Sequence, residues 1–468
     1  MNSVKKNFIY NIVYQILVMA IPLITAPYLA RVIGSAGVGT YSYTYSIVYY
    51  FMMLTLLGVN NYGNRSVAKV RDDKKKLSKV FWGIYIFQLC MGMLMLVLYL
   101  GCVFAFESKY RSIALIQSVF IVSAILDINW LYFGLEKFKI TITRNAFLKV
   151  LSVILIFIFV RKRGDLWKYT LIMSGTTVLS QLVLWGILRK EVTLVKISLA
   201  DIKRHIKPNL VLFIPVIAVS LYKMMDKIML GYLVNVVEVG YYENAEKIMN
   251  IPQALIAALG TVMLPRMSNM IASGNKQEMK NYIEKSVSFI MFMSFAMCLV
   301  LVAIGYNFAP LYFGKEFQKT GILIMMLAVT LPFVSFANVI RTQYLIPMEK
   351  DREYIISVGL GAVVNLIVNL ILIPRFSSVG VCVGTIMAEF SVMAYQVAEI
   401  WHELDFKKYI KNICPFFFKS AVMFIVMYVF NYIDMSSAVR LLLQIMAGGL
   451  VYLILNFRYM MMLLRNRK

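Results

Sequence analysis

The chain has 468 residues, of which 60% are hydrophobic and 15% are charged, and its formal net charge is +25. Charged residues make up about a quarter of an ordinary soluble domain, so this composition excludes one. The basic residues gather in short clusters between apolar runs instead of covering one surface, and we therefore predict no nucleic-acid partner.

Apolar stretches follow one another along the whole chain. There are about fourteen, and each is close to the ~20 residues that a helix needs to cross a bilayer. Because an open sheet cannot satisfy its backbone polar groups in lipid, every span should be a helix. We predict an all-α integral membrane protein with short loops. The expected spans are 8–30, 40–60, 80–103, 112–134, 140–160, 169–188, 209–232, 240–264, 286–305, 320–343, 354–374, 378–400, 414–433 and 439–458.

The first of these spans contains two prolines, Pro22 and Pro27. Proline removes a helix hydrogen bond and bends the helix, and in transporters such breaks often belong to helices that move. A fixed packing kink explains them equally well. We predict that this pair takes part in gating.

The basic segment 189–208 separates the first six spans from the next six, and a weak internal repeat relates the two sets. Ile33-Gly34 after the first span parallels Leu230-Gly231 after the seventh, and a Gly-Tyr start follows each. Six spans per half would give both copies the same orientation, although tyrosines also recur at membrane interfaces for other reasons. The predicted parts are an N-lobe (1–188), the linker (189–208), a C-lobe (209–400), and two last spans with a tail (401–468).

Lysine and arginine clusters alternate between heavy and light from one inter-span segment to the next. The heavy clusters fall on the same side as the N-terminus, and by the positive-inside rule both termini are then cytoplasmic. These clusters would also contact anionic lipids. The segment 161–168 departs from the pattern because its basic residues fall on the outside. The heavy clusters lie at 65–79, 189–207, 350–352, 407–411 and 465–468.

Charged residues inside the predicted spans are the most informative feature. A charge at mid-bilayer costs at least ~2.5–3.5 kcal/mol, so it normally faces a watery cavity or a partner. This pattern predicts a polar path through the membrane. For Arg31, Arg144 and Arg341 the alternative is a side chain that reaches the interface. The basic candidates are Arg31, Arg144, Lys149, Lys223, Lys227, Lys247 and Arg341, and the acids are Asp226, Glu243, Glu246 and Glu389.

Lys223 and Lys227 are four residues apart and share one helix face, with Asp226 beside them. An internal ion pair that only tunes packing is the alternative to a binding role. The cysteines form no CxxC pair, and the two histidines, His205 and His402, lie in basic connectors. We therefore predict no metal site and no disulfide.

Four stretches of the chain resemble the polysaccharide transporter branch of the multidrug/oligosaccharidyl-lipid/polysaccharide exporter superfamily. Their order and placement, from residue 8 to about 375, carry the resemblance, since no single motif is decisive. The stretches are Ala26 to Gly34 with Gly37 to Tyr41, Asp127 to Phe138 with Thr143-Arg144-Asn145 and Lys149, Asp226 to Gly231 with Val239 to Tyr242, and Arg341 to Pro347 with Asn365, Asn369 and Leu372-Ile373-Pro374.

The resemblance implies two pseudo-symmetric six-helix lobes around a central cavity, two further C-terminal helices, and alternating access. It implies a flippase for undecaprenyl-diphosphate-linked oligosaccharide repeat units of O-antigen, capsule or exopolysaccharide in the bacterial inner membrane. Membrane lipids, a polysaccharide polymerase and a chain-length regulator are the expected partners, and no cofactor is expected. A proton or sodium gradient or the membrane potential would drive transport, with Asp226, Glu243 and Glu389 as coupling candidates.

The physical reading agrees with the resemblance, because an anionic diphosphate requires a cationic, hydrated passage. Alternatives remain within the superfamily. A multidrug exporter should present acids to cationic drugs, whereas here the basic candidates outnumber the acids. A peptidoglycan-precursor flippase shares the lipid diphosphate and stays open. A membrane polymerase or ligase is disfavoured because the outer loops hold no catalytic constellation.

Overall fold

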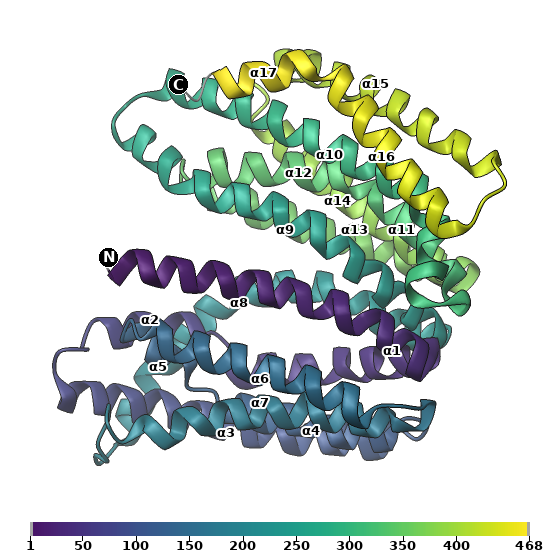
Figure 1. Ribbon diagram of the computed structural model, residues 1–468. Helices are drawn as coiled ribbons and strands as arrows, with labels where there is room; N and C mark the ends of the chain where they lie inside the picture. Colours follow the sequence, from purple (N-terminus) through teal and green to yellow (C-terminus); the bar gives the residue numbers. More distant parts are fainter. Residues whose placement is uncertain (1–2, 466–468) are drawn as a thin grey trace. The chain divides into compact units, whose positions relative to one another are not determined.

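The computed structural model describes the backbone of residues 3–465, and within it the side chains other than those of 3–17, 19, 214–219, 221–223, 276 and 464. All regular structure in this part of the chain is helical (Figure 1). The described residues contain 12 helical segments that are long and apolar enough to cross a membrane. The all-α membrane fold predicted from the sequence is confirmed.

The predicted number of spans also agrees with the helices. The first membrane segment, Ala20–Ala68, holds both the first and the second predicted span. The two are joined within α1 (Ser3–Leu56), which breaks at Gly34, where φ is 71° and ψ is 178°. Residues with a side chain rarely adopt a positive φ, so glycine is needed here. The seventh predicted span lies in α8 (Leu199–Leu233), which begins inside the predicted linker.

The chain divides into two compact units, residues 1–231 and 232–468. In the first unit α4 packs against α1, α3 and α7, and α6 packs against α7 and α1. The lobe boundaries predicted from the sequence stay predictions. Besides α1 and α8, the helices of this unit are α2 (Val59–Ala68), α3 (Lys74–Phe106), α4 (Arg111–Ile125), α5 (Asn129–Gly134), α6 (Phe138–Phe159) and α7 (Leu166–Leu188).

Helix α8 contacts α1 and α2 at several points along its length. The Tyr62 hydroxyl lies 2.7 Å from the Nδ1 atom of His205. Further along, the Tyr50 hydroxyl donates to the backbone oxygen of Ser220 at 3.4 Å. At the end of the unit, a side chain at Gly231 would overlap the ring of Tyr43. The seventh predicted span therefore packs with the second.

In the second unit α10 packs against α11, α12, α15 and α16, and α13 packs closely along α14. A π-helical turn, Arg341–Leu345, continues α12. The helices are α9 (Val236–Ala272), α10 (Lys276–Phe313), α11 (Gln318–Ala328), α12 (Thr330–Ile340), α13 (Asp351–Phe376), α14 (Ser378–Glu399), α15 (Phe406–Val429), α16 (Ser437–Leu455) and α17 (Phe457–Arg465).

Helix α13 shows why these sequences form membrane helices. Ser357, Gly361, Asn365 and Asn369 recur every four residues and are buried against α14. The opposite face is apolar and exposed, for example at Leu370. This is the reverse of a soluble helix, because lipid takes the place of water outside.

Candidate functional site

Arg144 lies at the centre of a polar cluster in the first unit. Its side chain is 7% exposed. The guanidinium donates to the backbone oxygen of Ser180 at 2.9 Å and to the side-chain oxygens of Asn129 at 2.8 Å and Asn145 at 2.7 Å. These partners lie on α7, α5 and α6. The charged group therefore ties three helices together by charge-assisted hydrogen bonds.

The stretch that includes Asp127 supports the same cluster. The Asp127 carboxylate accepts from the backbone N–H of Asn129 at 2.9 Å and from its side chain at 2.7 Å. Trp130 is fully buried, stacks on Phe81, and donates to Gln88 Oε1 at 3.2 Å. Trp130 therefore packs in the core of the unit. The sequence alone left open whether it lines a cavity.

The other basic candidates of the first unit differ in exposure. Arg31 is exposed on α1 near the Gly34 break, and Lys149 is half-buried on α6. Asp226 and Lys227 are buried on α8, with 3% and 9% of their surface exposed. The side chain of Lys223 lies outside the described residues, so the helix face that it is predicted to share with Lys227, and its pairing with Asp226, stay predictions. Their roles in binding likewise stay predictions.

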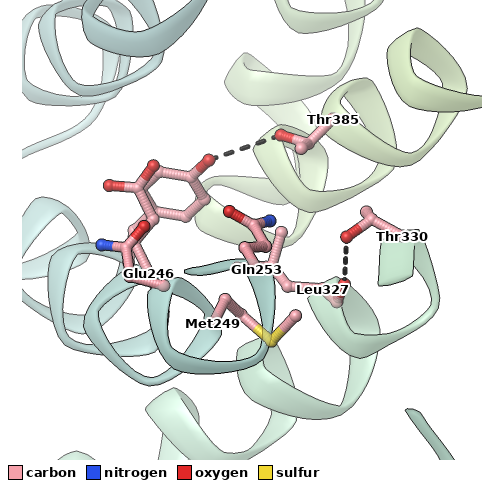
Figure 2. Close-up of a pocket in the computed structure, with 8 residues that line it drawn as sticks. Glu246, Met249, Gln253, Leu327, Thr330 and Thr385 are labelled. Carbon is pink, nitrogen blue, oxygen red and sulfur yellow. Dashed lines mark hydrogen bonds between the residues drawn. The ribbon is translucent and has the colours of Figure 1, made fainter. Parts of the chain in front are cut away.

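A small pocket opens beside α9 in the second unit, and we call it the α9 pocket (Figure 2). Its cavity volume is about 50 Å³. Asn250 is exposed, whereas Tyr242 and Met249 are buried. Three other helices complete the wall. The lining residues are Tyr242, Glu246, Met249, Asn250 and Gln253 of α9, Leu327 of α11, Thr330 of α12 and Thr385 of α14.

The hydroxyl groups in the α9 pocket have defined hydrogen-bond directions. The Thr385 hydroxyl donates to the backbone oxygen of Val381 at 3.0 Å, and the Tyr242 hydroxyl lies 3.3 Å from Thr385 Oγ1 (Figure 2). Thr330 donates its proton to the backbone oxygen of Leu327 at 2.6 Å. Thr330, which donates to the backbone, therefore presents lone pairs to the pocket. Glu246 adds a carboxyl group, which makes the pocket rich in acceptors.

Charged residues that the sequence predicts to bind substrate or to couple transport to an ion lie close to this pocket, on the same helices. Lys247 Nζ lies 3.4 Å from Glu243 Oε1 and 3.4 Å from Asn244 Oδ1. A predicted binding residue and a predicted coupling residue are thus brought together. Glu389 is half-buried on α14, one turn after Thr385.

Arg341 begins the π-helical turn, a distortion that often occurs at functional sites. Its guanidinium lies 5.6 Å from the ring centre of Tyr354 on α13. In the same turn Tyr344 donates to Glu403, which also accepts from Lys350. Burial alone would raise the pKa of Glu403, but the bonds from Lys350 and Tyr344 outweigh it and lower the pKa.

The sequence analysis missed most of the α9 pocket. Its signal was present on α9, because Glu246, Asn250 and Gln253 recur at i, i+4 and i+7 inside an apolar span, and so share one face. Thr330 and Thr385 had no such signal. Among the described residues, no group of three or more histidine, cysteine or carboxylate side chains could hold a metal ion.

Two family models match parts of the chain. Residues 4–271 match the model of the family described as "Polysaccharide biosynthesis protein". The chain belongs to this family. Residues 212–388 also match the MatE model. The superfamily resemblance inferred from the four sequence stretches is confirmed.

Named relatives cover most of the chain. The "Putative O-antigen transporter" of Escherichia coli (strain K12) is 25% identical over 394 residues, which cover 83% of this chain and 94% of that protein. The "Probable low-salt glycan biosynthesis flippase Agl15" of Haloferax volcanii is 22% identical over 278 residues, covering 59% of this chain and 58% of that protein.

Solved structures share the fold. The lipid II flippase MurJ in its inward closed conformation superposes with a TM-score of 0.80 at 14% identity, covering 97% of this chain and all of that chain. An inward-facing multidrug resistance MATE transporter superposes with a TM-score of 0.59 at 13% identity, covering 84% of this chain and 99% of that chain. The protein is a multi-pass membrane protein of this fold.

Proposed function

We propose that this protein is a flippase that moves undecaprenyl-diphosphate-linked oligosaccharide repeat units across the bacterial inner membrane. The observation that carries the proposal is the family match over residues 4–271, together with a named O-antigen transporter that aligns with 83% of the chain. The proposed product is a lipid-linked unit of O-antigen, capsule or exopolysaccharide on the outer face. The protein acts as a transporter and not as an enzyme.

Basic residues inside the helices supply the chemistry that this substrate needs. A diphosphate carries its charge on several oxygens, and arginine can bond two of them while lysine supplies a point charge. Lys149 and Lys227 are the candidates within the membrane helices of the first unit, and Lys247 and Arg341 those of the second. Arg31 and Lys223 complete the set. Arg144 is already bonded within its unit and has the strongest structural role.

Alternating access would come from two lobes that rock around the substrate. Pro22 and Pro27 lie inside α1, where each removes one helix hydrogen bond, and they are the proposed gating residues. An ion gradient or the membrane potential would drive the cycle. Asp226, Glu243 and Glu389 are the proposed coupling residues, and Glu243 lies beside Lys247. Replacing each acid by its amide should change the dependence of transport on ion gradients.

Location and partners follow from the same proposal. Both termini would be cytoplasmic, by the positive-inside rule. The outer-leaflet product would pass to a polysaccharide polymerase and its chain-length regulator, with the membrane lipids as the surrounding solvent. No cofactor enters the proposed cycle.

The experiment that tests the function measures lipid-linked repeat units and surface polysaccharide in cells that lack the protein. Inner-leaflet accumulation with loss of surface polymer, restored by the wild-type chain, is the expected result. Lys149→Gln should lower transport without lowering membrane abundance. Unchanged intermediates together with altered resistance to cationic drugs would contradict the proposal and favour a drug exporter.

A peptidoglycan-precursor flippase is the second candidate, because the MurJ fold covers 97% of this chain with a TM-score of 0.80. Its substrate is also a lipid diphosphate. Rescue of cells depleted of their own peptidoglycan-precursor flippase would favour this candidate. Failure to rescue, with restored surface polysaccharide, favours the polysaccharide substrate.

A further inference from the structure

The last two membrane helices, α15 and α16, leave much of their surface to the lipid. They pack mainly against α10 and against each other (Figure 1). The rest of their surface is apolar and exposed, for example at Phe418, Ile425 and Met446. Lipid covers such a surface in a membrane protein. A membrane lipid can therefore reach these helices without entering the protein.

One lysine interrupts the exposed face of α15. Lys419 lies inside the membrane segment Phe406–Tyr432, and Pro415 and Val422, which share its helix face, are exposed. Its ammonium lies 3.4 Å from the Oδ1 atom of Asn456, and it forms no ion pair within the described part of the chain. A charge in hydrocarbon is costly without a partner. This lysine therefore calls for an anion or for water at the membrane surface.

Arg458 brings a second cation to the same junction. Asn456 is fully buried at the end of α16, and Arg458 follows it by two residues on α17. Arg458 is exposed, and among the described residues no carboxylate or carbonyl group binds its guanidinium. Neither Arg458 nor Lys419 belongs to the basic clusters between the predicted spans. The two cations are therefore separate from the signal that orients the chain in the membrane.

Aromatic contacts hold α17 beside Lys419. The ring centre of Tyr459 lies 4.8 Å from that of Phe416 on α15 and 5.3 Å from that of Phe292 on α10. Phe416 precedes Lys419 by about one helical turn. The start of α17 is thus fixed next to the segment of α15 that carries the lysine, while the neighbouring Arg458 stays exposed.

A second lysine on α15 shows how the protein balances a charge internally. Lys408 Nζ lies 2.7 Å from a carboxylate oxygen of Glu284 on α10. Lys419 lies roughly 16 Å further along the helix, at 1.5 Å per residue, which is too far for the same carboxylate. The α15–α17 junction therefore carries positive charge that no acid balances within the residues that the structure describes.

The phosphate of a phospholipid matches this junction in chemistry and in position. Lysine and arginine both bind phosphate oxygens through charge-assisted hydrogen bonds. Asn456 and Arg458 end the last predicted span, so they lie at the level of the lipid headgroups, and the long side chain of Lys419 can extend to that level. The positive-inside rule makes this the cytoplasmic side, where anionic lipids attract basic residues.

We propose that Lys419 and Arg458 bind the phosphate of an anionic phospholipid at the junction of α15, α16 and α17. The acyl chains of this lipid lie along the exposed apolar face of α15 and α16. The bound headgroup holds α17 to the last pair of membrane helices. The inference goes beyond the proposed function, because it does not depend on which substrate the protein moves.

Native mass spectrometry of the purified full-length protein tests the site. Phosphatidylglycerol and phosphatidylcholine with the same acyl chains are the probes. Wild type should bind phosphatidylglycerol at least about tenfold more tightly, because the choline group balances the phosphate in the other lipid. Lys419→Gln and Arg458→Gln should each weaken phosphatidylglycerol binding about fivefold. Arg458 is exposed, so its variant tests the site even if Lys419→Gln does not fold.

Lys411→Gln is the matched control, because it removes the same charge from an exposed position about two turns earlier on α15. It should keep the wild-type preference for phosphatidylglycerol. An equal loss in Lys411→Gln would show a diffuse attraction for anionic lipid and would overturn the inference. Equal binding of the two lipids by wild type would overturn it as well.

Thermal unfolding in bilayers of each lipid separates lipid binding from a structural role of Lys419 at the end of α16. Phosphatidylglycerol should raise the unfolding midpoint of wild type above that in phosphatidylcholine, and both variants should reduce this difference. If Lys419→Gln is destabilised equally in both lipids, Lys419 only supports the helix end and the inference is wrong.

The lipid-linked substrate is the competing occupant, because its diphosphate has the same chemistry. Farnesyl diphosphate serves as its probe and is added to wild type that has bound phosphatidylglycerol. Retention of phosphatidylglycerol at an equal concentration of the diphosphate supports the proposed lipid. Its displacement would assign the junction to the substrate and overturn the inference.

Discussion

The Arg144 cluster of the first unit and the α9 pocket of the second use polar groups inside a membrane protein in opposite ways. In the cluster, oxygens on three helices take up the donors of one buried guanidinium. In the pocket, the hydroxyl groups of Thr330 and Thr385 donate to backbone oxygens beside an open cavity. The buried charge thus ties helices together, whereas the hydroxyl and amide groups of the pocket line an open cavity.

The largest expected effect on stability comes from breaking the Arg144 cluster. Arg144→Ala leaves the oxygens of Ser180, Asn129 and Asn145 without their donor, and we expect a loss of about 2–4 kcal/mol in the free energy of unfolding. Thermal unfolding of the purified protein in detergent measures it. Arg31→Ala is the control, because Arg31 is exposed, and it should change stability by at most about 0.5 kcal/mol. Unchanged stability with lost transport in Arg144→Ala would make Arg144 a substrate ligand instead.

A second effect tests the helix packing behind the pocket. Gly384 precedes Thr385, and a Cβ at Gly384 would overlap the side-chain oxygen of Asn369 on α13. Gly384→Ala should therefore cost about 1–3 kcal/mol through overpacking. Gly359 on α13 is the matched control. A Cβ there meets no atom within 4 Å, so Gly359→Ala should stabilise the helix by about 0.5–1 kcal/mol. Two thermal shifts of the same sign would contradict the packing of α13 on α14.

A substitution in the α9 pocket should hardly change the free energy of unfolding. Gln253→Ala shortens a half-buried side chain at the edge of an open cavity, so we expect a change within about 0.5 kcal/mol. The same thermal assay that reports the loss in Arg144→Ala measures it. A loss as large as that of Arg144→Ala would show that Gln253 holds the helices together and would remove the contrast between the two regions.

The smallest effect depends on pH and concerns the basic segment before the predicted seventh span. A hydrogen bond from Ser198, followed by the contact with Lys79 at 3.0 Å, lowers the pKa of Asp201 to about 2. Because the folded state favours the carboxylate, its stabilisation is complete above the ordinary value of 3.8 and disappears as the pH falls through about 2.

Wild type and Asp201→Asn should therefore differ in unfolding midpoint near neutral pH and converge between about pH 4 and pH 2. Asp72→Asn, at an exposed position between α2 and α3, should follow wild type throughout. A difference between wild type and Asp201→Asn that persists to pH 2 would contradict a stabilisation carried by the carboxylate.

The sequence predicted the helices well because their lengths and apolar runs are set by the bilayer. Gly34 was recognised at the end of the first span, but the sequence could not show that the helix continues directly through a single residue of positive φ. Glu246 was noticed as a charge in a span. Its partners in the pocket were not, because Thr385 is distant in sequence and an isolated threonine in an apolar helix gives no signal. Contacts such as that of Arg144 with Ser180 depend on how helices rotate about their axes, which hydropathy does not determine.

The contacts of α8 with α1 and α2 also set an order for synthesis. Tyr43, Tyr50 and Tyr62 find their partners on α8 only after the chain has been made as far as Gly231. At about 5–20 residues per second of synthesis, the first six spans wait in the membrane for a few seconds before α8 covers its side of α1. A chain stopped after the sixth span would keep that side open permanently and would become a substrate for membrane quality control, whereas a chain stopped after Gly231 could close its first unit.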